Sequence, residues 1–216
     1  RSDEGGDVMA RVAVLGGTFD PIHLGHLAAA QGVLHLTGVE RVIFLPNRQP
    51  PHKQGQPVTP AEHRAAMVRL AIADNPAFGF SDLELRRPGP SYTIETVRAL
   101  AAAHPDWEPA FVIGLDSLLE IRTWREWETL LQSVDFFVVT RPGHDLAAAH
   151  RLLAELGPRL TARVRLLEIP GVAVASADLR RLAAQGYPLR YLVPDPVARY
   201  IAEHGLYRRD DGHDNG

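Results

Sequence analysis

GGTFDPIHLGH, at residues 16–26, is the stretch from which the fold of this chain can be worked out. The apolar run at 12–15 before it predicts a buried strand, and the alanine-rich segment at 27–36 after it predicts a helix. A glycine-bearing turn between a strand and a helix is where parallel α/β sheets bind phosphate groups. Gly16 and Gly17 let the backbone approach a polyanion closely, and two histidines three residues apart can face the same anion. The spacing is neither that of the dinucleotide motif G-x-G-x-x-G nor that of the loop G-x-x-x-x-G-K-[ST].

The composition is that of an ordinary globular protein. The 216 residues, 45% of them hydrophobic and 23% charged, suffice for one sizeable domain. The formal net charge of −3 gives no electrostatic support to a nucleic-acid partner, so local cations would have to hold a polyphosphate ligand. The absence of cysteine excludes disulfides, thiolate metal sites and cysteine nucleophiles, and it fits a cytoplasmic protein. No apolar run approaches the roughly 20 residues of a membrane span, so we expect no membrane partner.

Apolar runs alternate with helical patterns along the chain. Strands are expected at 12–15, 42–45, 78–81, 110–113, 136–140 and 164–167. Helices are expected at 24–37, 60–74, 93–103, 116–121, 126–132, 145–156, 177–185 and 195–204. Strands that alternate with helices of about 10–15 residues predict an α/β fold. We expect a Rossmann-like, doubly wound parallel sheet with flanking helices in a single domain.

Composition along the chain also predicts where the folded domain begins and ends. We expect one nucleotide-binding domain over 9–208, with polar tails at 1–8 and 209–216. The tails are expected to be disordered or, before Met9, left over from expression. The segment 46–60 contains five prolines and no hydrophobic periodicity, which predicts a long binding loop.

The eleven-residue motif resembles the signature of the HxGH nucleotidylyltransferases, which move a nucleotidyl group from a nucleoside triphosphate to a phosphorylated acceptor. Further segments extend the likeness: Leu45-Pro46 with Pro50-Pro51-His52-Lys53, GPSYTIET at 89–96, IGLDSL at 113–118 with Thr123-Trp124, ASADLR at 175–180 and YLVP at 191–194. Together they are similar to bacterial nicotinate-nucleotide adenylyltransferases over nearly the whole chain. That family joins nicotinate mononucleotide to the adenylyl group of ATP, giving nicotinate adenine dinucleotide and pyrophosphate in NAD biosynthesis.

The reaction implied by this resemblance needs charge neutralisation and no covalent enzyme intermediate. A phosphate monoester acceptor is already largely ionised at pH 7, because its second pKa is about 6. The remaining task is to align two polyanions and to neutralise charge on the α-phosphate and the leaving pyrophosphate. The donors expected to do this are His23, His26, Lys53 and Arg180, with Mg²⁺ carried by ATP and no metal site of the protein's own.

The resemblance implies two substrate sites. The residues expected to bind ATP are Gly16, Gly17, Thr18, Phe19, His23, His26, Asp116, Ser176 and Arg180. Those expected to bind the mononucleotide are Lys53, Tyr92, Thr93 and Trp124. Backbone N–H groups around the Tyr-Thr pair would hold the pyridine carboxylate, since a helix start binds carboxylates well. The tryptophan would stack on the pyridine ring, and Asp116 would accept hydrogen bonds from ribose hydroxyls.

A plain structural role remains open for each of these side chains. The alternatives are capping or core histidines at His23 and His26, a solvated lysine at Lys53, a helix cap at Thr93 or Asp116, a core tryptophan at Trp124 as at Trp127, and Arg181 in place of Arg180. A zinc site built on the two histidines lacks a third ligand with an obvious spacing.

One run departs from the family pattern, which usually reads Ile-Ser-Ser-Thr or Ile-Ser-Ala-Thr, then two residues and an arginine. Here the run is Val174-Ala175-Ser176-Ala177, followed two residues later by Arg180. The first hydroxyl and the threonine are both replaced by alanine, so those side chains cannot contact ATP. Free N–H groups at the helix start, or the Ser176 hydroxyl, would have to serve instead.

Other functions stay open. An adenylyltransferase on the same scaffold could use nicotinamide mononucleotide or phosphopantetheine, although the latter has no ring to stack on Trp124. A nucleotide-binding module without turnover is supported only by the altered run at 174–177, and the presence of all four expected donors counts against it. The sequence leaves the oligomeric state open, including a homo-oligomer.

Overall fold

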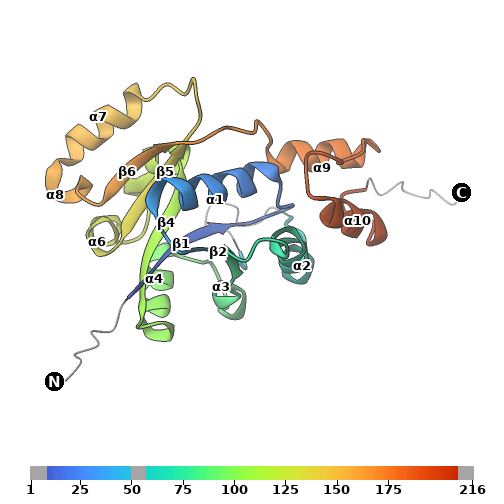
Figure 1. Cartoon of the computed structure of the whole chain (residues 1–216), viewed down its shortest axis with the longest axis horizontal. Coiled ribbons are helices and arrows are strands. Elements are labelled where there is room, and N and C mark those ends of the chain that lie inside the picture. Colours follow the sequence, from blue (N-terminus) through green and yellow to red (C-terminus); the bar gives the residue numbers. More distant parts are fainter. Residues whose placement is uncertain (1–8, 50–56, 209–216) are drawn as a thin grey trace, which may run out of the picture.

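A computed structural model of the chain describes residues 9–49 and 57–208, and it contains one six-stranded sheet (Figure 1). The strands are β1 (Ala10–Gly17), β2 (Arg41–Pro46), β3 (Phe78–Phe80), β4 (Trp107–Gly114), β5 (Asp135–Thr140) and β6 (Val164–Glu168). Their order is β3-β2-β1-β4-β5-β6, and every neighbouring pair is parallel. The order reverses between β1 and β4, as in a doubly wound sheet, so the expected Rossmann-like fold is confirmed.

Helices cover both faces of the sheet. One hydrophobic cluster joins the sheet to α1 (Leu24–Thr37), α2 (Ala61–Ile72), α9 (Ser176–Ala184) and α10 (Asp195–Glu203). The other joins it to α3 (Leu83–Arg86), α4 (Thr93–Ala103), α5 (Leu115–Leu119), a 3₁₀ turn (Ile121–Thr123), α6 (Trp127–Ser133), α7 (Ala147–Leu156) and α8 (Pro158–Thr161). Parallel sheets need such a cover on both faces, because their strands are apolar on both sides.

The apolar run at the start of the chain supplies both faces at once. Successive side chains of a strand point to opposite faces, so Ala13 and Leu15 enter one cluster and Val14 enters the other. The same alternation separates Phe44 from Leu45 on β2. A continuous run of buried residues is therefore what the central strands of this fold require.

The expected strands and longer helices are all present, with ends shifted by a few residues. The short helices α3 and α8 were not expected, because four residues carry too little periodicity to be detected. Residues 47–49 and 57–60 form neither helix nor strand, in keeping with the expected loop. The middle of that loop and the two expected tails lie outside the described residues.

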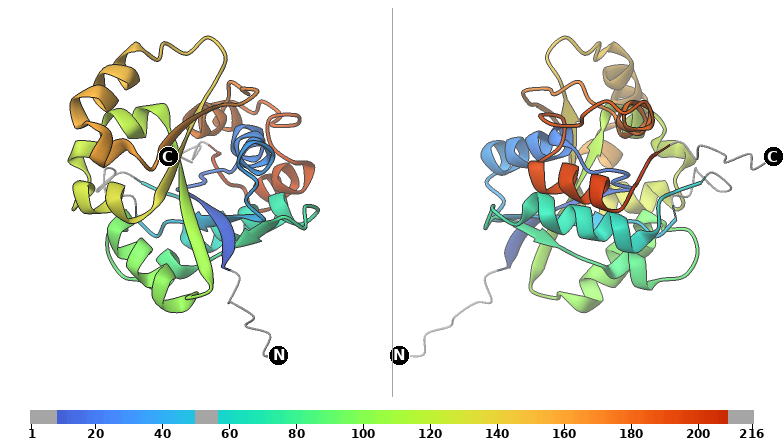
Figure 2. Two further views of the ribbon diagram at one scale, coloured as in Figure 1. Left: turned by 60° about the vertical axis from the view of Figure 1, so that its left-hand side comes forward. Right: turned by 90° about the vertical axis from the view of Figure 1, so that its right-hand side faces the viewer.

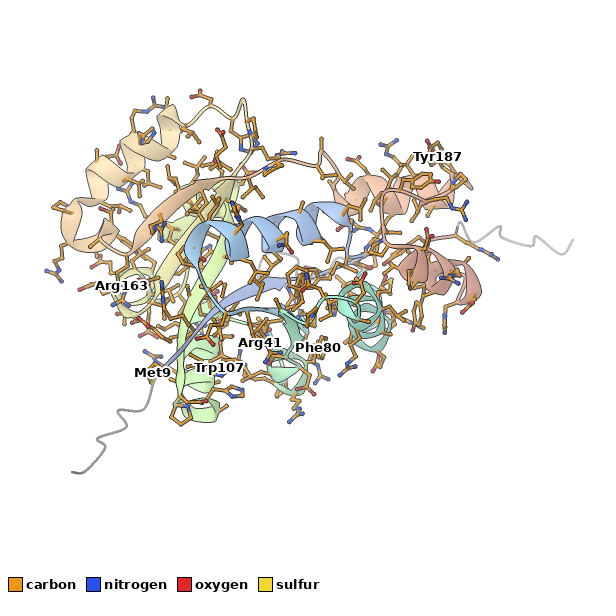
Figure 3. All side chains as sticks on the ribbon, in the orientation of Figure 1. Met9, Arg41, Phe80, Trp107, Arg163 and Tyr187 are labelled. Atoms are coloured by element: carbon orange, nitrogen blue, oxygen red, sulfur yellow. The ribbon has the colours of Figure 1, made fainter. Side chains whose placement is uncertain are left out.

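The C-terminal segment crosses the molecule. From β6 the chain runs to α9 and α10 on the opposite side (Figure 1), where α10 packs beside α2 (Figure 2). Figure 3 shows Tyr187 at the outer end of α9, far from Met9 and Trp107, which mark the ends where β1 and β4 begin. This crossing brings the last described residues against the turn that follows β1.

Candidate active site

Two cavities lie at the carboxyl ends of the central strands. We call the larger, of about 750 Å³, the histidine cavity because His23 and His26 line it, and the smaller, of about 210 Å³, the tryptophan cavity because Trp124 lines it. Both are lined by Gly16 at the end of β1 and by Val112 on β4. Ligands of open α/β sheets bind at this point, where the strand order reverses.

The two histidines are held by backbone N–H groups at the start of α1. His23 is the N-cap, and its Nδ1 accepts a hydrogen bond from the N–H of Gly25 at 3.1 Å. Nδ1 of His26 accepts from the N–H of His23 at 3.1 Å. Because each Nδ1 is an acceptor, the ring proton of the neutral histidine lies on Nε2 and remains free to be donated. The capping role left open by the sequence is therefore real, and it also fixes the donor that an anion would meet.

Both histidines are neutral at pH 7. Burial lowers the pKa of His23 to about 4. Burial and the neighbouring His23 together lower the pKa of His26 to about 3. The two rings stack with their centroids 3.7 Å apart. If both were protonated, the two imidazolium cations would repel each other at this distance. The two histidines, expected from the sequence as donors, are thus uncharged and carry their ring proton on Nε2.

Gly25 permits this arrangement of the histidines. A Cβ atom at this position would lie 2.9 Å from Nδ1 and Cε1 of His23, closer than such atoms can approach. The glycine of the HxGH motif is thus required by the His23 ring, which lies directly over the backbone of residue 25.

Arg180 lies beside the turn that leads to His23, although it lines neither cavity. Its Nη1 donates to the backbone oxygen of Asp20 at 2.8 Å, so the guanidinium lies beside the turn between β1 and α1. Arg181 is exposed and pairs with Asp178 at 3.0 Å. Ser176 donates its hydroxyl to the backbone oxygen of Pro21 at 2.9 Å. Arg180 and Ser176 are thus bonded to the turn and Arg181 is not, and contact of Arg180 and Ser176 with ATP stays a prediction.

The histidine cavity is also lined by polar side chains from the segments that follow β4 and β5. Asp116 is exposed in the first turn of α5 and lines this cavity. Gly114 is the N-cap of that helix, so the alternative role of Asp116 as a cap is wrong. Arg141 and His144, which follow β5, line the same cavity and were missed, because the sequence around them carries no motif.

The tryptophan cavity is built around the start of α4. Tyr92, Thr93 and Trp124 all line it, whereas Trp127 does not. Tyr92 is the N-cap of α4 and no side chain caps the helix, so the cap expected at Thr93 is wrong. The guanidinium of Arg125 lies 3.6 Å from the centroid of the Tyr92 ring. The structure thus brings together three of the four residues expected to bind the mononucleotide; Lys53 lies outside the described residues.

A buried glutamate in the wall of the tryptophan cavity was not foreseen. Glu84 of α3 accepts a hydrogen bond from the hydroxyl of Thr96 at 2.6 Å, and Arg87 donates to that hydroxyl at 2.8 Å. Burial raises the pKa of Glu84. The buried Oγ of Ser91, which also lines the cavity, has no hydrogen-bond partner among the described residues. No spacing rule in the sequence connects α3 with α4, so only the fold reveals this cluster.

Two residues of the glycine-rich turn have packing roles. Phe19 is 2% exposed, and its ring lies edge-on to His26 with the centroids 5.0 Å apart. Thr18 accepts hydrogen bonds at its hydroxyl from Asn47 and at its backbone oxygen from Arg64. Neither Phe19 nor Thr18 lines either cavity, so their contact with ATP stays a prediction.

Arg64 links the turn between β1 and α1 to both ends of the proline-rich segment 46–60. This arginine of α2 is 1% exposed and donates to the backbone oxygens of Thr18, Asn47 and Thr59 at 2.8 Å each and of Arg48 at 3.1 Å. A buried arginine with four carbonyl partners satisfies most of its donors. The position gave no signal in the sequence, because three of these partners lie 16 or more residues away along the chain.

Comparison with known proteins agrees with this geometry. The model of the cytidylyltransferase-like family matches residues 14–182. Among solved structures, the Plasmodium falciparum nicotinic acid mononucleotide adenylyltransferase complexed with NaAD has a TM-score of 0.74 at 19% identity, covering 91% of this chain and 97% of that one. At 19% identity, this match to a solved structure shows that the two chains share a fold. Fold and family match together define a nucleotidyltransferase.

Relatives with higher sequence identity show which nucleotidyltransferase family the chain belongs to. A curated protein of Symbiobacterium thermophilum, described as a probable nicotinate-nucleotide adenylyltransferase, is 92% identical over 96% of this chain and 100% of its own length. A protein of Desulfitobacterium hafniense strain DCB-2 with the same description is 42% identical over 92% of this chain and 96% of its own length. This chain belongs to the nicotinate-nucleotide adenylyltransferase family, as the resemblance of its motifs implied.

Over 9–49 and 57–208, no helix is long and apolar enough to cross a membrane. Over the same ranges, no group of three or more histidine, aspartate or glutamate side chains is placed to hold a metal ion.

Proposed function

We propose that this protein transfers the adenylyl group of ATP to nicotinate mononucleotide, with release of pyrophosphate and formation of nicotinate adenine dinucleotide. The observation that carries the proposal is the pair of cavities that share Gly16 and Val112. ATP occupies the histidine cavity, and the pyridine ring occupies the tryptophan cavity. The reacting phosphates then meet beside Gly16, where no side chain separates them.

The catalytic groups act by electrostatic stabilisation. The mononucleotide phosphate attacks the α-phosphate of ATP in line, and pyrophosphate leaves without a covalent enzyme intermediate. The Nε2–H groups of His23 and His26 and the guanidinium of Arg180 donate to the phosphate oxygens on which charge develops. Lys53 is proposed as a fourth donor on its place in the family motif alone. Neutral histidines suit this role because each Nδ1 accepts a backbone hydrogen bond, which keeps the ring proton on Nε2.

The first turn of α9 offers a substitute for the two missing hydroxyls. The N–H groups of Ser176, Ala177 and Asp178 donate to no group among residues 9–49 and 57–208. Free N–H groups at a helix start bind anions and carry the positive end of the helix dipole. We propose that they hold ATP phosphates in place of the side chains that alanine has replaced.

Selection of the acid form of the pyridine follows from the start of α4. The N–H groups of Tyr92 and Thr93 donate to no group within the described part of the chain, and both residues line the tryptophan cavity. A carboxylate presents only acceptors to them, whereas a carboxamide would place its NH₂ against an N–H donor. Trp124 stacks on the ring and leaves its carboxylate directed at these donors.

The metal ion, the cellular location and the bounds of the catalytic domain are also part of this proposal. Mg²⁺ enters as part of the substrate MgATP, where it neutralises the β- and γ-phosphates. We propose a cytoplasmic location, where ATP is available, and a single catalytic domain over residues 9–208. A homo-oligomer is compatible with this proposal, because both cavities are lined by residues of one chain.

Pyrophosphate release tests the proposal. The protein is supplied with MgATP and, in separate assays, with nicotinate mononucleotide, nicotinamide mononucleotide or phosphopantetheine. We expect kcat/KM for the nicotinate form to exceed that for the nicotinamide form by at least about a hundredfold, since unpaired buried polar groups cost that much. Equal values for both pyridines would contradict recognition of the carboxylate. ATP binding without release of pyrophosphate in the presence of any of the three acceptors would indicate a non-catalytic nucleotide-binding module.

A further inference from the structure

The C-terminal segment contacts the turn between β1 and α1 through four hydrogen bonds. Two are those of Ser176 and Arg180 to backbone oxygens of the turn. In the third, the N–H of Leu24 donates to the backbone oxygen of Leu192 at 3.0 Å. In the fourth, the phenol of Tyr207 donates to Oδ1 of Asp20 at 2.5 Å. The turn that carries the catalytic histidines is therefore held from outside by the last part of the fold.

Asp20 is the residue on which these contacts converge. It is 4% exposed, and each of its acceptor groups has its own donor. Oδ1 accepts from Tyr207, Oδ2 accepts from the N–H of Thr59 at 3.1 Å, and the backbone oxygen accepts from Arg180. A shift of Asp20 would therefore move the anchor of Arg180 and the peptide that leads to His23.

Tyr207 is the only donor to Oδ1 of Asp20 among the described residues. Burial and the hydrogen bond to Asp20 raise the pKa of Tyr207 well above its usual range, so the phenol remains protonated and keeps donating. Tyr207 follows α10 and lines neither cavity, and its hydroxyl is directed at Asp20. It also lies beyond the part of the chain matched by the family model.

We propose that Tyr207 is a positioning residue for adenylyl transfer. Through Asp20, it fixes the carbonyl that holds Arg180 and the turn that presents His23 to the phosphates. This inference rests on the proposed function, because it assigns Arg180 and His23 to the transferring phosphate. The phenyl ring of Tyr207 packs into the hydrophobic cluster of α1 and α2, and only its hydroxyl performs the positioning.

The test removes that hydroxyl alone. In Tyr207→Phe, we expect kcat to fall roughly tenfold, because small misplacement of catalytic groups is costly. KM for ATP and for nicotinate mononucleotide should each stay within about twofold, since the donors act mainly in the transition state. Tyr187→Phe is the matched control: Tyr187 is 57% exposed at the outer end of α9 (Figure 3), and its change should leave both constants unaltered.

A double-mutant cycle separates positioning from general loss of structure. In an Arg180→Lys background, Tyr207→Phe should lower kcat by clearly less than tenfold, because the share of its effect that acts through Arg180 is already gone and only the share that acts through His23 remains. The same tenfold fall in both backgrounds would overturn the proposal, as would a Tyr207→Phe enzyme with the kcat of the parent. A Tyr207→Phe chain that no longer folds by circular dichroism would overturn it too, since the hydroxyl would then serve the fold. A parent protein that releases no pyrophosphate would instead contradict the proposed function itself.

Discussion

Oγ1 of Thr96 lies 2.6 Å from Oε1 of Glu84, and this hydrogen bond ties the first turn of α4 to α3 behind the tryptophan cavity. Thr96 is fully buried, and Glu84 is 7% exposed. The bond fixes the backbone whose N–H groups, at Tyr92 and Thr93, are proposed to hold the pyridine carboxylate.

Removal of this acceptor should weaken binding of one substrate only. In Glu84→Ala, the buried Thr96 hydroxyl loses its acceptor, and we expect KM for nicotinate mononucleotide to rise about tenfold. KM for ATP should change less than about twofold, because ATP occupies the other cavity. Glu84→Gln keeps an acceptor oxygen and should restore most of the affinity. Steady-state kinetics with each substrate varied in turn decides this, and an equal rise in both KM values would contradict it.

Loss of the second histidine should impair the chemical step. Nε2–H of His26 is a preorganised donor in the histidine cavity, and removal of one such donor typically costs ~10²–10³ in rate. We therefore expect His26→Ala to lower kcat strongly while circular dichroism shows an unchanged fold. His35→Ala, at an exposed position of the same helix, is the control. A folded His26→Ala enzyme within about threefold of the parent kcat would remove His26 from the mechanism.

Trp124 should affect the mononucleotide far more than ATP. Stacking of a ring on an aromatic side chain is worth roughly 1–3 kcal/mol. In Trp124→Ala, KM for nicotinate mononucleotide should thus rise about five- to a hundredfold, with KM for ATP nearly unchanged. Trp127→Phe is the control, because Trp127 lines neither cavity. If both KM values rise together, Trp124 serves the core alone.

The buried histidines should make the protein less stable in mild acid. Unfolded histidine has a pKa of about 6.5, whereas the pKa is lowered to about 4 for His23 and about 3 for His26 in the folded chain. Below pH 6.5 the unfolded chain therefore binds protons that the folded chain does not, and the free energy of unfolding falls as the pH decreases toward 4. Each histidine contributes a slope of roughly 1.4 kcal/mol per pH unit in this window.

Urea unfolding at several pH values measures this slope. The parent is compared with His23→Asn/His26→Asn, in which neither position titrates between pH 4 and 6.5. The double variant should lose stability less steeply on acidification than the parent does. Identical slopes would show that the two histidines are protonated in the folded protein as readily as in the unfolded one.

The sequence by itself determined the architecture and the place of the candidate site in the fold. The strands around Val14 and Phe44 were readable because burial on both faces demands a continuous apolar run within a few residues. The HxGH motif located the histidine cavity because the turn after the first strand of such a sheet lies at the strand-order reversal. Both signals are local, since they depend on residues within about one element of each other.

Only the tertiary structure decided how these residues work. The neutral state of His23 and His26 follows from burial, which no local pattern measures. The hydrogen bond of Arg180 to the turn follows from the docking of α9. The bond from Tyr207 to Asp20 joins residues 187 positions apart. Such a contact exists only after the whole chain has folded back on itself, so the sequence could name the catalytic turn but not the groups that hold it in place.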